Sequence, residues 1–399
     1  MFVRQYILKQ RALESRQRGL DAAQVGDYEV ALDQVGRYLQ RFGLDSDVEA
    51  MLAYAKARRE VPLPNGKHIE QTISHLRQIL SIQPDNSDAR HELVGVYSDI
   101  GYGLETISLA EDILAKKPDD IYALEARAKA HMRMQKYDAA LGDANKVAAL
   151  APADVENHIL ALSAIRSMKK SADEILAYPD TVPGLDRGSA EYHIVQAIAH
   201  EFAGKRDETV DWAKRAAAVP ATNTTNAKTV ELIDNLLSRL SIFSADRLEL
   251  QRLDLDMLAQ SAGRLADTEL KRLLIRRLFE TGNTRAVVKL MEQVPTDTAD
   301  SAMLGILGLT HAKLDKREQV EGVVQHLAKR NDRAAIAWRE ILSVFYLDEE
   351  LPARDLVENC KKYAELDERN PYFTYYLGRA YERNGESDLA LRTCSLASQ

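Results

Sequence analysis

The sequence predicts an all-α fold, a right-handed superhelical solenoid of about ten to eleven antiparallel helix pairs. Three prolines, Pro84, Pro118 and Pro152, lie at two successive intervals of 34 residues, and each follows an amphipathic segment. A repeat of this length is typical of helical solenoids, in which every hairpin packs on its neighbours. The chain of 399 residues also exceeds the usual size of one hydrophobic core, which favours a repeat array.

The composition favours helix throughout. Hydrophobic residues make up 45% of the chain, charged residues 29% and aromatic residues only 6%, while Gly and Pro lie mainly between amphipathic runs. No run approaches the roughly 20 apolar residues that a membrane-spanning helix needs. We therefore predict a cytoplasmic protein, with the soluble part of a membrane-associated protein as the alternative.

Charge and cysteine content argue against several classes of function. The net charge of −8 comes from 53 basic and 61 acidic residues, with both signs mixed along the chain. A general nucleic-acid binder would need a basic face instead. Cys360 and Cys394 are too few for a disulfide framework and too far apart for a structural zinc site. We expect no metal, no cofactor and no nucleic-acid partner, and we expect both cysteines to be buried in helices.

Small residues and turn residues recur within the repeats. The first unit contains Gly19 and the segment Gly26-Asp-Tyr-Glu-Val-Ala-Leu, in which the glycine permits the positive φ that ends a helix and Ala31 permits close helix packing. The units that begin at Pro84 and Pro118 match each other in length and helix placement.

These residues resemble the tetratricopeptide repeat family. The last unit matches the same pattern again, at Leu377, Gly378, Tyr381, Gly385 and Ala390. The resemblance implies helical hairpins stacked into a scaffold that binds other proteins.

Proline and glycine divide the array into parts. Residues 179–188 contain two prolines and two glycines, which predicts a joint. We therefore predict an N-terminal repeat array over 1–178, degenerate helical hairpins over 189–265, and a C-terminal repeat array over 266–399. A further break is predicted near 221–226.

No catalytic motif withstands inspection. Gly101-Tyr-Gly103 is an isolated Gly-x-Gly at a turn between helices, and His91-Glu92 lacks the second histidine of a zinc-protease helix. The chain has neither a Walker loop nor a Gly-x-Ser-x-Gly elbow. We predict that it is not an enzyme and has no catalytic residues.

The family resemblance implies a binding surface. In tetratricopeptide arrays the first helix of each pair lines a concave groove, and tyrosine and arginine are common anchors of binding interfaces. Carried over by register, the candidate partner-binding residues are His91, Tyr122, Glu125, Lys129, Arg133, Arg166, Tyr372, Tyr375 and Arg379. The expected partner is a protein or peptide of unknown identity, bound in the groove or along the edges of the solenoid.

Two alternatives to a simple scaffold stay open. In the first, the chain is a structural or assembly subunit, or the soluble arm of a membrane-tethered secretion or envelope complex. In the second, it is the targeting arm of a longer enzyme. The basic segment over residues 1–18 is compatible with peripheral or tethered membrane association, although an N-terminal capping helix with solvated cations is the favoured interpretation. No capping helix follows the last hairpin, which predicts a longer polypeptide or self-association at the C-terminal end.

Overall fold

The computed structural model describes residues 2–43, 47–63, 66–219, 226–242, 244–265, 268–294, 299–367 and 370–397. These residues form 22 α-helices and no strand, which confirms the predicted all-α fold. The chain divides into two compact units, Met1–Ala216 and Ala217–Gln399, here called unit 1 and unit 2. Within the described residues, no helix combines the length and the apolar character that crossing a membrane requires.

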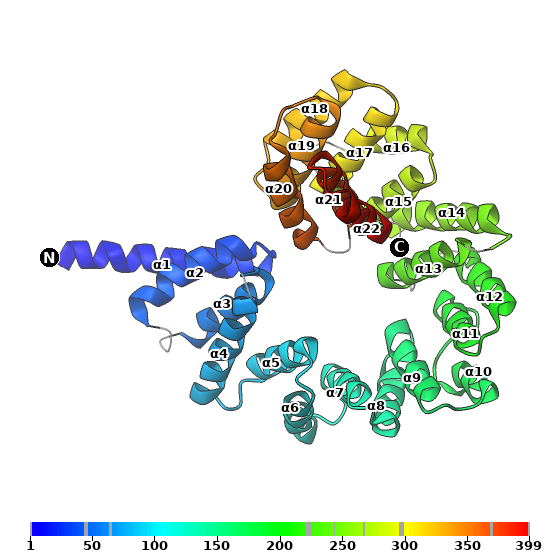
Figure 1. The fold of residues 1–399 in the computed structure, drawn as a ribbon. Helices are drawn as coiled ribbons and strands as arrows, with labels where there is room; N and C mark the ends of the chain where they lie inside the picture. The colour runs from blue at the N-terminus through cyan, green and yellow to red at the C-terminus, as the bar shows by residue number, and fades with distance from the viewer. Residues whose placement is uncertain are drawn as a thin grey trace. The chain divides into compact units, whose positions relative to one another are not determined.

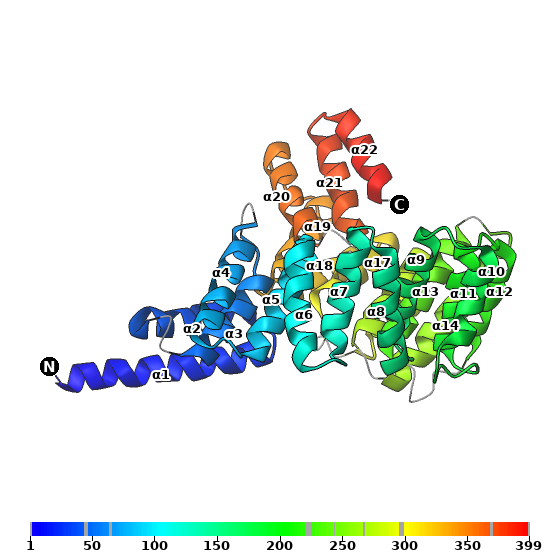
Figure 2. The same ribbon diagram turned by 90° about the horizontal axis from the view of Figure 1, so that it is seen from below.

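Unit 1 is a succession of helical hairpins (Figures 1 and 2). Its helices are α1 (Phe2–Gln24), α2 (Tyr28–Phe42), α3 (Val48–Glu60), α4 (Lys67–Ile82), α5 (Ser87–Ile100), α6 (Gly103–Lys116), α7 (Ile121–Arg133), α8 (Tyr137–Leu150), α9 (Val155–Ser167), α10 (Ala172–Thr181), α11 (Ala190–Phe202) and α12 (Arg206–Ala218). From α1 to α11 each helix packs on the next, and α5, α7, α9 and α11 also pack in succession, so this stacking is that of a tetratricopeptide-like solenoid.

The 34-residue period is the period of the helix N-caps. Two residues after Pro84, Pro118 and Pro152, the side chains of Asn86, Asp120 and Asp154 accept hydrogen bonds from backbone N–H groups in the first turns of α5, α7 and α9. Such caps satisfy N–H groups that a helix cannot pair internally. The prolines therefore mark where each hairpin begins.

The turns inside the hairpins share a left-handed residue at the same spacing. Gly101 has φ of 83°, and at successive 34-residue steps Gln135 and Lys169 have φ of 59° and 55°. Only glycine adopts this region without steric cost. The fold therefore imposes this turn geometry even where the sequence lacks the glycine that favours it.

Close packing between the two helices of a hairpin explains the small residues. A Cβ on Gly19 would overlap Val35 in α2, and one on Gly378 would overlap Cys394. Ala31 has no exposed surface, as its predicted role requires. Cys360 is buried as predicted, whereas Cys394 is only half-buried.

Unit 2 is a second set of hairpins. Its helices are α13 (Ala227–Ser241), α14 (Arg247–Leu265), α15 (Thr268–Glu280), α16 (Thr284–Met291), α17 (Ser301–Lys313), α18 (Arg317–Ala328), α19 (Arg333–Tyr346), α20 (Ala353–Leu366), α21 (Pro371–Arg383) and α22 (Ser387–Ala397). The largest fully buried side chain in its core is Trp338, which packs on Gly305 in α17 and Phe373 in α21. The odd-numbered helices of unit 2 are the first helices of their hairpins.

The predicted joint and the predicted break can each be compared with the helix boundaries of the structure. Helix α10 continues through Pro179 to Thr181, and residues 182–189 lead to α11, so the predicted joint over 179–188 includes the end of a helix. Of the predicted break at 221–226, residues 221–225 lie outside the described residues, and Asn226 is the N-cap of α13. The boundaries of the predicted arrays, the number of pairs and the handedness of the superhelix stay predictions.

Candidate functional site

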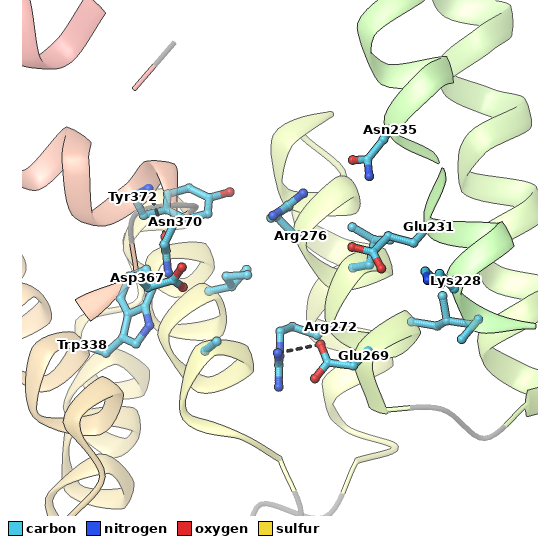
Figure 3. Close-up of a pocket in the computed structure, with 15 residues that line it drawn as sticks. Lys228, Glu231, Asn235, Glu269, Arg272, Arg276, Trp338, Asp367, Asn370 and Tyr372 are labelled. Carbon is cyan, nitrogen blue, oxygen red and sulfur yellow. Dashed lines mark hydrogen bonds and ion pairs between the residues drawn. The ribbon is translucent and has the colours of Figure 1, made fainter. Parts of the chain in front are cut away.

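The first helices of unit 2 enclose a cavity of about 420 Å³, here called the groove cavity. It is lined by residues of α13, α15, α17, α19 and the start of α21, and by Asp367 before it. Figure 3 shows Trp338, Asp367, Asn370 and Tyr372 on one side and Lys228, Glu231, Asn235 and Arg276 on the other. The cavity thus lies on the helices that a tetratricopeptide-like solenoid uses for its groove.

Apolar and charged groups alternate around the groove cavity. Leu270, Leu273 and Ile306 supply apolar surface from α15 and α17. Arg272 is fixed in place, because its Nε donates to Asp300 Oδ2 at 2.7 Å and its Nη1 to Glu269 Oε2 at 2.7 Å. A lining of this kind can hold an apolar side chain while polar groups orient its backbone.

Two polar atoms of the groove cavity have no hydrogen-bond partner among the described residues. They are Nε1 of Trp338, a side chain with no exposed surface, and the hydroxyl of the half-buried Tyr372. The two rings are neighbours, with centroids 6.0 Å apart. An unpaired buried polar group costs about 1–3 kcal/mol, so an acceptor that reached either donor would recover part of this free energy.

The environment of Tyr372 keeps its hydroxyl protonated. Burial and then the negative charge of Glu280 raise the pKa of Tyr372 above its ordinary value, a weak hydrogen bond toward Glu280 adds to this, and Arg276 and Arg277 oppose it only in part. The hydroxyl therefore stays available as a hydrogen-bond donor. Arg276 is itself in an ion pair with Glu280, at 3.5 Å.

In unit 1 the structure brings several predicted site residues together on α5 and α7. The rings of His91 and Tyr122 are 5.8 Å apart between centroids, and Arg133 donates to the carbonyl oxygen of Ser98. Lys129 is exposed and Glu125 half-buried on the same helix.

Sequence reasoning missed Arg59, at the end of α3. Its guanidinium forms ion pairs with Glu92 at 3.2 Å and with Asp99, and Tyr122 lies beside it over Gly95. Arg59 lies near the end of its first helix, within one position of the places that Asp99 and Arg133 hold in theirs. That register was the available signal, but the longer loop after Arg59 interrupts the 34-residue spacing.

The remaining predicted residues do not join this group. Arg166 is exposed in α9, and its guanidinium lies 4.9 Å from the centroid of the Phe202 ring in α11. Tyr375 and Arg379 follow Tyr372 in α21, where Tyr375 Oη accepts from Arg379 Nη1 at 3.3 Å. Of the three predicted residues of α21, Tyr372 alone is among those that line the groove cavity.

Within the described residues, no cluster of three or more His, Cys, Asp or Glu side chains has the arrangement of a metal site. The polar groups around the groove cavity are instead suited to hydrogen bonds and ion pairs with a bound partner.

Comparison with known proteins finds similarity in solved structures only. No family model matches the chain, and no curated protein matches its sequence. A tetratricopeptide repeat protein from Parabacteroides merdae is 12% identical, with a TM-score of 0.43 over 62% of this chain and 99% of its own. MamA from AMB-1 is 17% identical, with a TM-score of 0.31 over 52% of this chain and 98% of its own.

A third similar structure, a human IFIT1 dimer with m7Gppp-AAAA, is 12% identical with a TM-score of 0.34, over 98% of this chain and 93% of its own. At these identities and TM-scores, what the similar proteins bind does not extend to this chain.

Proposed function

We propose that this chain is a non-enzymatic interaction scaffold that binds an extended peptide segment of a partner protein in the groove cavity of unit 2. The observation that supports this proposal is the pair of unpaired polar atoms, Trp338 Nε1 and Tyr372 Oη, at a cavity enclosed by first helices. Each peptide residue offers a backbone carbonyl as acceptor. The volume of the cavity is within the range of about 300–1,000 Å³ that is usual for ligand sites.

The predicted residues of unit 1 are proposed as a second contact face. Tyr122, Lys129 and Arg133, with His91 and Glu125, lie on α5 and α7, and tyrosine and arginine are frequent interface anchors. Their internal hydrogen bonds and ion pairs make this face a weaker candidate, because a partner must compete with contacts already formed.

Peptide selection against the full chain tests the groove. Peptides chosen by display are crosslinked to the protein, and the crosslinked residues are located by mass spectrometry. We expect the crosslinks to fall on α13, α15, α17, α19 and α21. Peptides that bind but crosslink only to the second helices of the hairpins would contradict the proposal.

A Tyr372→Phe variant tests the hydroxyl. We expect it to weaken peptide binding by about 3- to 10-fold, because one hydrogen bond contributes about 0.5–1.5 kcal/mol. Its free energy of unfolding should change little, since the hydroxyl has no hydrogen bond of normal geometry in the free protein. Tyr381→Phe is the matched control, because Tyr381 is on the same helix but packs near Val357 and Cys360. Equal binding by the two variants would exclude a role for the Tyr372 hydroxyl.

An assembly role is the second candidate, favoured by exposed apolar side chains on α22. Leu391 is 72% exposed and Leu396 63% exposed. We propose that this face associates with another protein surface, which buries the leucines. A Leu391→Glu and Leu396→Glu double variant should lower any self-association seen by light scattering. A wild-type mass equal to the monomer at all concentrations tested would oppose self-association.

A further inference from the structure

Basic residues gather at the ends of two first helices of unit 1. Between Glu125 and Asp138 the chain has four lysines and arginines and no acidic residue, and between Glu156 and Asp173 it has three and again no acidic residue. These stretches contain the C-terminal ends of α7 and α9, together with the turns that follow them. Both are locally cationic in a chain whose net charge is −8.

The two basic stretches lie on neighbouring hairpins, whose first helices α7 and α9 pack on each other. Their turns have the same geometry, because Gln135 and Lys169 are both left-handed and are 34 residues apart. The Lys136 N–H donates to the His131 carbonyl oxygen at 2.8 Å, and the Lys169 N–H to that of Arg166 at 2.9 Å. Each turn therefore folds back on the last turn of its first helix, which places the cations of both hairpins on one surface.

Most of these cations have no carboxylate partner. Arg127 binds both oxygens of Asp143, at 2.8 Å and 2.7 Å, and Lys170 pairs with Glu174 at 3.2 Å. The others are exposed and form no ion pair with any residue that the structure describes. They are here called the basic surface: Lys129, Arg133, Lys136, Arg166 and Lys169.

Both guanidinium groups of the basic surface are held in place although neither has a carboxylate. Arg133 donates to the carbonyl oxygen of Ser98 at the end of α5, and Arg166 lies on the Phe202 ring of α11, 4.9 Å from its centroid. A guanidinium that is already positioned loses less side-chain freedom on binding, and its remaining N–H groups can bind a carboxylate as a fork.

The neighbouring acidic residues do not neutralise the basic surface. Asp138 and Asp173 lie in the first turns of α8 and α10, where the helix N-terminus favours a carboxylate. Asp99, one hairpin earlier, is already in an ion pair. Glu125 lies one turn before Lys129 but forms no ion pair with it. The basic surface therefore carries excess positive charge, to which an anionic partner is complementary.

We propose that the basic surface binds an acidic segment of a partner protein, a run of Asp and Glu side chains that lies across the ends of α7 and α9. Arg133 and Arg166 offer forks to its carboxylates, and the lysines offer point charges. This inference deepens the second contact face, with which it shares Lys129 and Arg133. It rests on the proposed scaffold function only in taking a protein segment as the ligand, and it does not require the groove cavity.

The local nature of the charge favours a short acidic segment over a larger polyanion. Exposed charges more than about 10 Å apart are largely screened at 0.1 M salt, so a short segment interacts with this surface alone. A nucleic acid or an anionic bilayer extends further and would also meet the acidic residues of a chain whose net charge is −8.

Fluorescence anisotropy of the full chain with the peptide fluorescein-(Asp-Glu)4-amide tests the proposal. The amide end removes the terminal carboxylate, and the matched peptide fluorescein-(Asn-Gln)4-amide removes the side-chain charges. We expect only the acidic peptide to bind, and its affinity to fall by about tenfold between about 50 and 300 mM salt, because salt screens exposed charges. No binding of the acidic peptide at the lower salt concentration, or equal binding of both peptides, would overturn the proposal.

A double variant, Lys129→Gln with Lys169→Gln, assigns the effect to the basic surface. It removes one exposed cation from each hairpin and no ion pair of the fold, so we expect a folded protein with about fivefold weaker binding of the acidic peptide. Lys67→Gln with Lys146→Gln makes the same charge change at exposed positions of α4 and α8, and it should bind like the wild type. Equal weakening by the two double variants would show that net charge alone matters and would refute the assignment. Lower stability with unchanged binding would show that the lysines serve only the helix ends.

Two further probes test the class of partner. A labelled oligothymidylate with the same number of charges as the peptide represents nucleic acid, and vesicles of phosphatidylcholine and phosphatidylserine represent an anionic membrane. We expect both to bind more weakly than the acidic peptide. Tighter binding of either, lost in the Lys129→Gln and Lys169→Gln variant, would overturn the assignment to a protein segment. Tyr372→Phe should leave binding of the acidic peptide unchanged, so failure here and failure of the groove proposal are separate results.

Discussion

Two buried aspartates show how the two units differ. Asp120 in unit 1 and Asp254 in unit 2 are each 4% exposed. Burial alone would raise the pKa of Asp120. Hydrogen bonds from the Ala123 N–H, Lys117 and His91 outweigh this effect, so the net shift is downward. Asp254 has no such donors, and its pKa shifts upward. Equal solvent exposure thus accompanies a satisfied cap in one unit and a carboxyl group with a raised pKa in the other, where Asp254 is the more deeply buried of the two.

The cavities show the same contrast. Unit 1 has a cavity of about 430 Å³ among α8, α9 and α10, as large as the groove cavity. Its lining polar groups include Tyr178, whose hydroxyl is 3.1 Å from His158 Nδ1, and Glu174, which forms a capping box with Ser171. Residues that line the groove cavity instead include two with unpaired polar atoms, Trp338 and Tyr372. Volume alone therefore does not distinguish a candidate site; unsatisfied lining groups do.

The largest expected effect tests how strongly the core of unit 2 depends on one side chain. Trp338→Ala should lower the free energy of unfolding by about 3–5 kcal/mol, because it leaves a large cavity. The matched variant is Trp212→Ala in unit 1, where the indole is only half-buried and Arg215 covers it at 4.4 Å, so the loss should be smaller. Denaturant unfolding of both variants measures the difference, and equal losses would contradict the comparison.

The pH dependence of stability should distinguish the two aspartates by sign. Asp254 has a raised pKa in the folded state, so its contribution is fully present below the unfolded pKa of about 4 and is lost as pH rises toward 9. Across this window the slope is at most about 1.4 kcal/mol per pH unit. Asp254→Asn should remove this slope in denaturant unfolding at pH 5 to 8.5. An unchanged slope would contradict the raised pKa.

Asp120→Ala should destabilise unit 1 by about 1–2 kcal/mol at pH 7, because it removes the N-cap of α7 together with the contacts to His91 and Lys117. The folded-state pKa of Asp120 is lowered, so its contribution is present above the unfolded pKa and is lost as pH falls below about 4. Urea unfolding at pH 7 and pH 3 measures this. A cost that persists undiminished at pH 3 would show that the carboxylate charge is not the cause.

The smallest expected effect is an increase in the stability of unit 1. Gln135→Gly should stabilise unit 1 by about 0.5–1 kcal/mol, because a left-handed residue with a side chain is replaced by one that adopts this region freely. Gly101→Ala, at the equivalent turn with φ of 83°, should change stability in the opposite direction by a similar amount. Thermal unfolding measures both, and a loss of stability in Gln135→Gly would show that its side chain has an unrecognised contact.

The regular part of the fold was predictable because its signals are local. The spacing of Pro84, Pro118 and Pro152 located three caps, and Gly101 located a turn that the structure repeats at Gln135 and Lys169. Register also placed His91 and Tyr122 on neighbouring helices, because α5 and α7 follow the strict period.

The groove cavity and the environment of Asp254 in unit 2 were less predictable because they depend on contacts between distant residues. Tyr372 was predicted from register, but Trp338 completes its cavity from another hairpin. Asp254 lies in the stretch over 189–265 that matches the repeat poorly, and its Oδ1 has no hydrogen-bond partner among the described residues because Arg277 is already bound to Asp234. No spacing in the sequence indicates which of two acids an arginine will bind.

The cap period of unit 1 has a genetic consequence. Each 34-residue block between prolines brings its own cap and its own turn, so an in-frame duplication or loss of one block leaves every remaining hairpin with both signals. In unit 2 a buried ion pair adds a constraint, because Asp234, which has no exposed surface, and Arg277 bind each other across 43 residues of chain. A duplication inserted between them would move Arg277 away from Asp234 and break this ion pair. The number of residues between the two is therefore constrained.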